Sequence, residues 1–130
     1  MRSAFATTWK KSVQTRKQRK YAYNAPYHVK GRFLSAHLSK ELKEKHGKRS
    51  VRVRKGDKVK VLRGTYKGRE AKAEKVDAQR GKVYLTRVEA RKMDGTSTPV
   101  AFNPSNLMIT ELDLSDKKRK AKLEQPEKKE

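Results

Sequence analysis

The sequence contains no cysteine in its 130 residues. Disulfide bonds and thiolate metal sites are therefore excluded, and this composition fits a reducing compartment. Apolar residues are also scarce, at 33%, which limits the hydrophobic core to a small one. No apolar run approaches the roughly 20 residues that a membrane-spanning helix needs. We expect one small domain with appendages and no membrane partner.

Acidic residues are absent from the N-terminal part of the chain until Glu41. The same stretch lacks the apolar region of a secretory signal. It is acid-free and rich in Ser, Thr and Arg, which is also the composition of a transit peptide. The basic character, however, continues without a break through Arg32, beyond any plausible cleavage point. We therefore expect the stretch to bind a partner rather than to direct targeting, and the protein to be cytoplasmic.

The residue patterns of common catalytic and cofactor sites are also missing. His28, His37 and His46 are widely spaced and have no cysteine partner, so they do not predict a metal site. The sequence has no Gly-x-Ser-x-Gly elbow and no Gly-x-x-x-x-Gly-Lys-Ser/Thr phosphate loop. Acidic residues of the central region fall mostly in turns or beside basic neighbours, which disfavours an acid–base pair. We predict no enzymatic activity, no cofactor, no metal and no small-molecule substrate.

Positive charge is what the chain has in excess. It contains 36 Lys and Arg against 14 Asp and Glu, a formal net charge of +22. Charge of one sign repels itself and favours a polyanion that neutralises it. Nucleic acid is the favoured polyanion, because no basic segment has the strong apolar face of a membrane-surface helix.

The chain is predicted to have three zones. They are a basic RNA-binding N-terminal extension at 1–37, a helix plus barrel at 38–112, and a charged C-terminal helix and tail at 113–130. The extension has little apolar periodicity, so we expect an extended arm with a short helix around Lys10–Arg19. It should be disordered when free and ordered when bound. Pro26 disfavours a helical conformation at Ala25, which predicts a turn or extended segment there.

The central zone is predicted to begin with a helix that Ser39 caps and Gly47 ends. Alternating apolar residues then predict short strands at 51–53, 58–62, 70–76, 82–88, 99–102 and 107–112. Met93–Thr96 contains Asp-Gly and predicts a two-residue hairpin loop of the primed type. Five or so short strands separated by turns indicate a mainly β fold, a small barrel.

The C-terminal zone is predicted to be a helix beside the barrel. Ser115 is expected to cap a helix over Asp116–Glu124. A basic run at 117–120 and the acidic residues after it give the zone mixed charge. We expect this helix to fray at its end.

Arg63-Gly-Thr-Tyr-Lys-Gly68 is the most informative segment of the sequence. It follows an alternating apolar run, so it predicts a tight loop that leaves a strand. Two glycines four residues apart allow positive φ and the close approach of another surface, although both could serve only to form the turn. Four cations lie on or beside the loop, namely Lys60, Arg63, Lys67 and Arg69. Small side chains and many positive charges suit a phosphate backbone.

Three segments in order give the chain a family resemblance. They are Tyr23-Asn-Ala-Pro-Tyr-His28, Leu38-Ser-Lys-Glu-Leu42 and the loop Arg63–Gly68, which looks like a KOW motif. The KOW motif alone is shared by several nucleic-acid-associated families. The ordered combination resembles the archaeal and eukaryotic type of the universal large-subunit ribosomal protein twenty-four family, called twenty-six in eukaryotes. One departure is Ala71, where family loops often have a third glycine; alanine fits there if the backbone stays in the β region.

The resemblance implies an SH3-like barrel with the KOW motif, an N-terminal extension and a C-terminal helix. It implies a structural constituent of the large ribosomal subunit that binds the five-prime domain of large-subunit ribosomal RNA near the peptide exit tunnel. It further implies contacts with neighbouring ribosomal proteins and a role in early subunit assembly. The alternative is a KOW-type transcription or RNA-associated regulatory module, which normally has a further domain and a less basic surface.

The expected RNA contacts follow from side-chain chemistry. Arginine can fork onto phosphate or stack on a base, lysine acts as a point charge, and aromatic rings stack on unpaired bases. The predicted RNA-binding residues are Arg16, Lys17, Arg19, Lys20, Tyr21, Asn24, Tyr27, His28, Lys30, Arg32, Arg49, Arg63, Gly64, Tyr66, Lys67, Gly68 and Arg69. Tyr66 is expected to be exposed at the loop tip. For the other tyrosines, packing against the barrel is an equally open alternative, as is a local turn hydrogen bond for Asn24 or His28.

Overall fold

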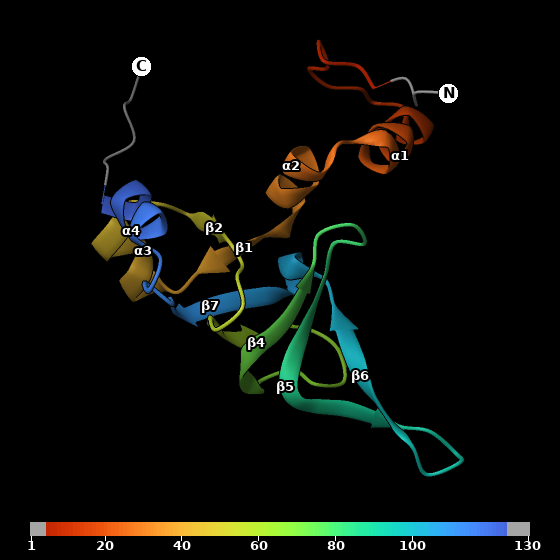
Figure 1. Ribbon diagram of the computed structural model, residues 1–130, viewed down its shortest axis with the longest axis vertical. Coiled ribbons are helices and arrows are strands. Elements are labelled where there is room, and N and C mark those ends of the chain that lie inside the picture. The colour runs from red at the N-terminus through yellow and green to blue at the C-terminus, as the bar shows by residue number, and fades with distance from the viewer. Residues whose placement is uncertain (1–4, 125–130) are drawn as a thin grey trace.

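The computed structural model describes residues 5–124 and is mainly β (Figure 1). One sheet has the strand order β2-β1-β7-β3-β4-β5-β6. Its strands are β1 Ser35–Leu38, β2 Ser50–Arg52, β3 Lys58–Val61, β4 Glu70–Asp77, β5 Lys82–Arg91, β6 Ser97–Phe102 and β7 Leu107–Glu111. The helices are α1 Thr15–Asn24, α2 Tyr27–Lys30, η1 Gly31–Leu34, α3 Lys40–His46, η2 Pro104–Asn106 and α4 Lys117–Glu124. The predicted architecture, a small barrel-like β fold with a helix before it and one at the C-terminal end, is confirmed.

The core follows the period-two pattern of the strands, in which alternate side chains face one side of the sheet. Val59 and Val61 of β3 are fully buried, as are Leu107 and Ile109 of β7. These two strands pair antiparallel in the middle of the sheet. The strong alternation in the sequence therefore reflects fully buried positions of the core.

The sheet begins earlier than predicted, at β1. Leu34, Ala36 and Leu38 are buried in the core, and β1 pairs antiparallel with β2 and parallel with β7. The expected boundary between the extension and the barrel, at residues 37 and 38, falls inside this strand. Four residues are too few for their alternation to stand out in a basic segment.

The two predicted ends of α3 are confirmed. The Leu42 N–H donates to Ser39 Oγ at 3.4 Å, and Gly47 adopts φ of 64° and donates its N–H to the Lys43 carbonyl. The side chain of Ser39 satisfies a donor that the first turn of a helix leaves free. Glycine takes the left-handed conformation that ends the helix without steric cost.

The predicted primed turn between β5 and β6 is wrong. The Lys92 N–H donates to the Thr96 carbonyl and the Gly95 N–H to the Lys92 carbonyl, which gives a three-residue loop. Only Gly95 there has positive φ, whereas a type I′ turn needs positive φ at both central residues. The Asp94 carboxylate accepts hydrogen bonds from the N–H and hydroxyl of Thr96, which stabilises the longer loop.

The first helix is displaced from its predicted position around Lys10–Arg19. α1 spans Thr15–Asn24, and the residue after it, Ala25, has a non-helical ψ of 136°. The end agrees with the effect expected of Pro26 on the residue before it. At the other end, the Gln18 side chain donates to the Ser12 carbonyl at 2.6 Å, and the N–H of Gln14 donates to Ser12 Oγ.

The C-terminal helix has a different cap from the one predicted. α4 begins at Lys117, and the N–H of Lys118 donates to Asp116 Oδ1 at 2.9 Å. Asp116, not Ser115, therefore caps the helix, because the N–H of Ser115 itself donates to Asp113. The expected fraying end, residues 125–130, lies outside the described residues. Over residues 5–124, no helix has the length and apolar character to cross a membrane.

Candidate nucleic-acid interface

The helix α1 exposes a dense set of cations. Arg16, Lys17, Arg19 and Lys20 are all exposed, the helix buries none of its residues, and it has no acidic residue in its first turn. Figure 1 shows α1 standing away from the strands. Its cationic surface is thus available over most of its circumference.

Tyr21 belongs to an aromatic cluster on this arm. Its ring stacks on Phe5 and Trp9 with centroid separations of 5.0 and 4.7 Å, and meets the ring of Phe33 edge-on. The sequence predicted that this tyrosine either stacks on an RNA base or packs against the barrel, and neither prediction included these aromatic partners. The cluster supplies an apolar contact that the scarce aromatics of the sequence did not suggest.

The other predicted residues of the arm differ in exposure. Tyr27, His28 and Arg32 are exposed on α2 and η1, whereas Lys30 and Asn24 are half-buried. Arg49 is exposed between α3 and β2. The arm thus offers cations together with two exposed aromatic rings, those of Tyr23 and Tyr27.

The loop between β3 and β4 has the backbone that its glycines predict. Gly64 and Gly68 have φ of 97° and 88°, and the N–H of Gly68 donates to the Val61 carbonyl at 2.8 Å. A side chain at either glycine would meet nothing within 4 Å. Glycine is therefore required at both positions by the backbone conformation rather than by crowding. The same open space leaves the loop accessible to a large ligand.

Tyr66 is not the exposed tip residue that was predicted. It is half-buried, packs on the core, and meets the ring of Phe102 edge-on at 5.9 Å. The Arg69 guanidinium lies 5.1 Å from the centroid of the Tyr66 ring. The tyrosine therefore anchors the loop and holds Arg69 over its face, while Arg63, Lys67 and Arg69 stay exposed.

Ala71 is compatible with its position. It lies in β4 opposite Val59, and the only positive φ outside glycine in residues 5–124 belongs to Arg87. The backbone at Ala71 is thus an ordinary strand. The departure from the glycine pattern needs no rearrangement of the loop.

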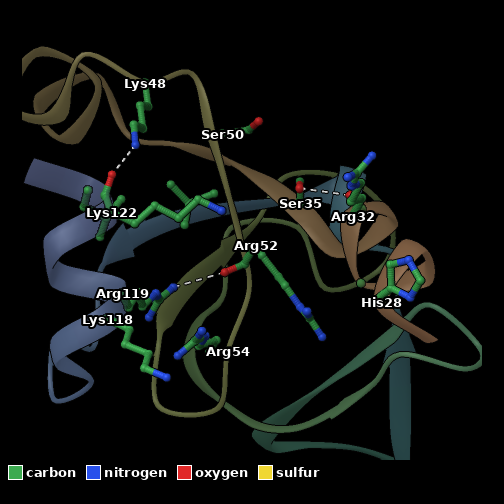
Figure 2. A pocket seen from close by; sticks show the side chains of 13 residues that line it. His28, Arg32, Ser35, Lys48, Ser50, Arg52, Arg54, Lys118, Arg119 and Lys122 are labelled. Carbon is green, nitrogen blue, oxygen red and sulfur yellow. Dashed lines mark hydrogen bonds between the residues drawn. The ribbon is translucent and has the colours of Figure 1, made fainter. Parts of the chain in front are cut away.

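A groove beside the predicted residues brings together cations that sequence reasoning missed. Its volume is about 480 Å³, and it lies between α2–η1, β2 and α4 (Figure 2). His28 and Arg32 were predicted; the further basic residues that line it are Lys48, Arg52, Arg54, Lys118, Arg119 and Lys122. These residues are far apart in the sequence, so no local sequence pattern predicts the groove.

A buried ion pair holds α4 against the barrel. Arg119 Nη1 and Nη2 donate to Asp57 Oδ1 and Oδ2, both at 2.6 Å, and the two side chains are 5% and 0% exposed. Arg119 also donates to the carbonyl oxygens of Asp113 and Arg52. The sequence suggested only a turn at Asp57, and its partner lies 62 residues later.

Two more carboxylates, Asp113 and Asp116, stabilise the segment that leads from β7 to α4. The hydrogen bond from the Arg54 side chain, followed by that from the Lys118 N–H, lowers the pKa of Asp116. The Ser115 N–H is the main cause that lowers the pKa of Asp113. Both groups are therefore ionised at neutral pH. Among residues 5–124, no group of three or more His, Cys, Asp or Glu is placed to hold a metal ion.

Comparison with known proteins shows the family to which the chain belongs. A family model that describes the eukaryotic ribosomal proteins L26 and their archaeal counterparts, numbered twenty-four, matches residues 12–126. The chain belongs to this family. A relative from Korarchaeum cryptofilum, the large ribosomal subunit protein uL24, is 49% identical over 114 residues, or 88% of this chain and 87% of the relative.

A second relative gives the same result. The large ribosomal subunit protein uL24 of Methanospirillum hungatei is 50% identical over 112 residues, which cover 86% of this chain and 93% of the relative. The chain is therefore a ribosomal protein of this eukaryotic and archaeal family, with the RNA-binding, structural character of that family. The residues that the family model matches include α1 and the β3–β4 loop.

Proposed function

We propose that this protein is a structural constituent of the large ribosomal subunit that binds the five-prime domain of large-subunit ribosomal RNA near the peptide exit tunnel. Its relatives bear the name of a large-subunit protein. The proposal includes a role in early subunit assembly, contacts with neighbouring ribosomal proteins and no catalytic step.

One observation supports RNA binding most directly: the cations on α1 and on the β3–β4 loop are exposed, and none of them forms a salt bridge within residues 5–124. Within residues 5–124, the salt bridges are Arg54–Asp116, Lys58–Glu111, Asp57–Arg119 and Lys120–Glu124. None of them involves the predicted cations of the arm or the loop. Such cations gain free energy when they neutralise phosphates and release condensed counterions.

The two cationic tracts have different tasks in the proposal. The rigid loop, anchored by Tyr66, holds Arg63, Lys67 and Arg69 in a fixed arrangement against an RNA backbone. The arm supplies Arg16, Lys17, Arg19 and Lys20 on a helix that follows a second tract of backbone. Exposed Tyr23 and Tyr27 are available to stack on unpaired bases, each at about 1–3 kcal/mol.

The test is binding of the purified chain to a transcript of the five-prime domain, compared with a transcript of another domain of the same RNA. The variant Arg63→Gln/Lys67→Gln/Arg69→Gln should bind more weakly. The logarithm of its association constant should also fall less steeply with the logarithm of salt, because up to about three phosphate contacts are lost. Its matched control, Arg80→Gln/Arg91→Gln/Lys92→Gln, removes the same charge from exposed positions outside the two tracts. Equal salt slopes for the two variants would contradict the assignment of the loop.

Association with ribosomes forms the second part of the test. The protein should co-sediment with large subunits in high salt, and crosslinks should map to the five-prime domain. Recovery only in fractions with RNA polymerase would instead support the regulatory class. Crosslinks confined to other domains would overturn the proposed position.

A further inference from the structure

We propose that the groove between α2–η1, β2 and α4 is a composite binding site for the RNA sugar-phosphate backbone. This inference rests on the proposed function, because it assigns one more surface of the chain to the same ligand. Figure 2 shows α4 with Arg119 and Lys122 on one side, His28 and Arg32 on the opposite side, and Arg52 and Arg54 between them.

The charges in the groove need an external anion. Seven of the thirteen lining residues are Lys or Arg, and none of the thirteen is Asp or Glu. Asp57 neutralises Arg119 and Asp116 neutralises Arg54. The other five, Arg32, Lys48, Arg52, Lys118 and Lys122, have no salt bridge in the described part of the chain. Like charges gathered in one concave surface repel one another and concentrate the field that attracts a polyanion.

The rest of the lining suits a phosphate chain. Ser50 contributes an exposed hydroxyl group to the groove, whereas the Ser35 hydroxyl already donates to the Arg32 carbonyl. Hydroxyl, backbone and cationic groups are the usual partners of phosphate oxygens. A groove of about 480 Å³ that opens to solvent admits a stretch of backbone rather than a whole helix.

Gly31 positions one of the free cations. The guanidinium of Arg52 lies so close to Gly31 that a Cβ there would clash with it. The backbone of Gly31 is helical, with φ of −59°, so glycine is not needed for its conformation. Its absent side chain is what gives Arg52 room beside η1, on the side of the groove where His28 and Arg32 lie.

The site exists only while α4 is docked. Lys118 and Lys122 enter the groove from α4, and Asp57 holds that helix through Arg119. The Lys48 side chain donates to the Lys122 carbonyl at 2.5 Å, which links the turn before β2 to the same helix. The buried ion pair is thus a positioning device, and it contacts no RNA itself.

The test measures binding of the full chain to the five-prime-domain transcript as a function of salt. The groove variant is Lys48→Gln/Arg52→Gln/Lys122→Gln, and the control variant is Lys75→Gln/Arg80→Gln/Lys92→Gln, which loses the same charge elsewhere. The groove variant should lose at least about tenfold more affinity at physiological salt than the control and show a shallower slope. Equal loss in the two variants, with intact binding by the wild type, would overturn the groove but leave the proposed function standing. A wild type that ignores the transcript would overturn both.

Two single variants keep the proposal testable if the triple variant folds poorly. Gly31→Ala keeps every charge and displaces only Arg52, and should weaken binding on the order of threefold. Arg119→Met keeps the five free cations in the chain but releases α4, which takes Lys118 and Lys122 out of the groove, and its loss of affinity should approach that of the groove variant. Unchanged binding by both would overturn the composite site. So would competition by polyglutamate as strong as that by RNA, because the groove would then fit an acidic peptide equally well.

Discussion

The carboxylate of Asp57 accepts four hydrogen bonds, two from the Arg119 guanidinium and one each from the N–H groups of Arg54 and Asp113. A buried charge is tolerated only when its hydrogen-bonding capacity is met in this way. The pair joins the start of β3 to α4. Asp57 is therefore the buried anchor of α4, beside the exposed links that Arg54–Asp116 and Lys48–Lys122 make to the same helix.

Replacing Asp57 by Asn should lower the free energy of unfolding by about 3–5 kcal/mol, because Arg119 would be left buried without a counter-charge. Urea denaturation followed by circular dichroism measures the change. The control is Glu111→Gln, which removes the exposed partner of Lys58 and should cost less than about 1 kcal/mol. Equal changes in the free energy of unfolding for the two substitutions would show that the buried ion pair stabilises the fold no more than the exposed one.

At the scale of elements, α4 is attached partly through a carboxylate, Asp116, whose pKa is lowered by its contacts. Asp116 caps it and pairs with Arg54, and both interactions favour the ionised carboxylate, so its pKa falls below the ordinary value of 3.8. The stabilisation is fully present above that value. It is lost as the pH falls through the lowered pKa of the folded protein.

The stability difference between wild type and Asp116→Asn should therefore be constant at neutral pH and shrink at the acid end of a titration. Urea midpoints measured from neutral to acidic pH provide the comparison. The variant Asp116→Ser keeps a capping oxygen, but its hydroxyl does not titrate in acid. Its stability should therefore lack the part of the acid-induced loss that comes from protonation of Asp116. A difference that persists undiminished in acid would rule out Asp116 as the group responsible.

The helix α1 is the element with the least support. It has ten residues and buries none of them, and its N-cap Gln14 makes no side-chain hydrogen bond. Isolated helices of this length are marginal in water. We therefore expect this helix to become fully ordered when an RNA backbone lies against its cations.

Trypsin should therefore cleave the free protein first within Lys10–Lys30 and spare this segment when RNA is bound. Sites in the paired strands, such as Lys58, serve as the internal control and should be protected in both states. Protection of Lys10–Lys30 in the absence of RNA would show that the aromatic cluster around Tyr21 is enough to order the arm.

At the scale of the whole molecule, local signals predicted the parts of the fold that depend on neighbours in the sequence. The ends of α3 follow from Ser39 and Gly47, and the strands around Val59 and Ile109 follow from alternation. The pairing of Asp57 with Arg119 joins residues 62 apart, so no local pattern marks it. The same holds for the groove, whose cations meet only after α4 has docked.

Tyr66 shows a limit of the site prediction. Its place between two glycines suggested exposure, but Phe102 on the edge strand offered it an aromatic partner. Burial of an aromatic ring outweighs its position in a loop. The cations beside it remain exposed, so the prediction of their role in RNA binding stays open to test.

The net charge of +22 is the property on which the whole account depends. We propose that a protein with this excess of positive charge reaches its working state together with a polyanion that neutralises it. The most direct test is the affinity of the wild-type chain for the five-prime-domain transcript across a series of salt concentrations. We predict a linear fall of the logarithm of the association constant with the logarithm of salt, with a slope of about −5 or steeper. A slope near zero, or no binding at physiological salt, would contradict the account.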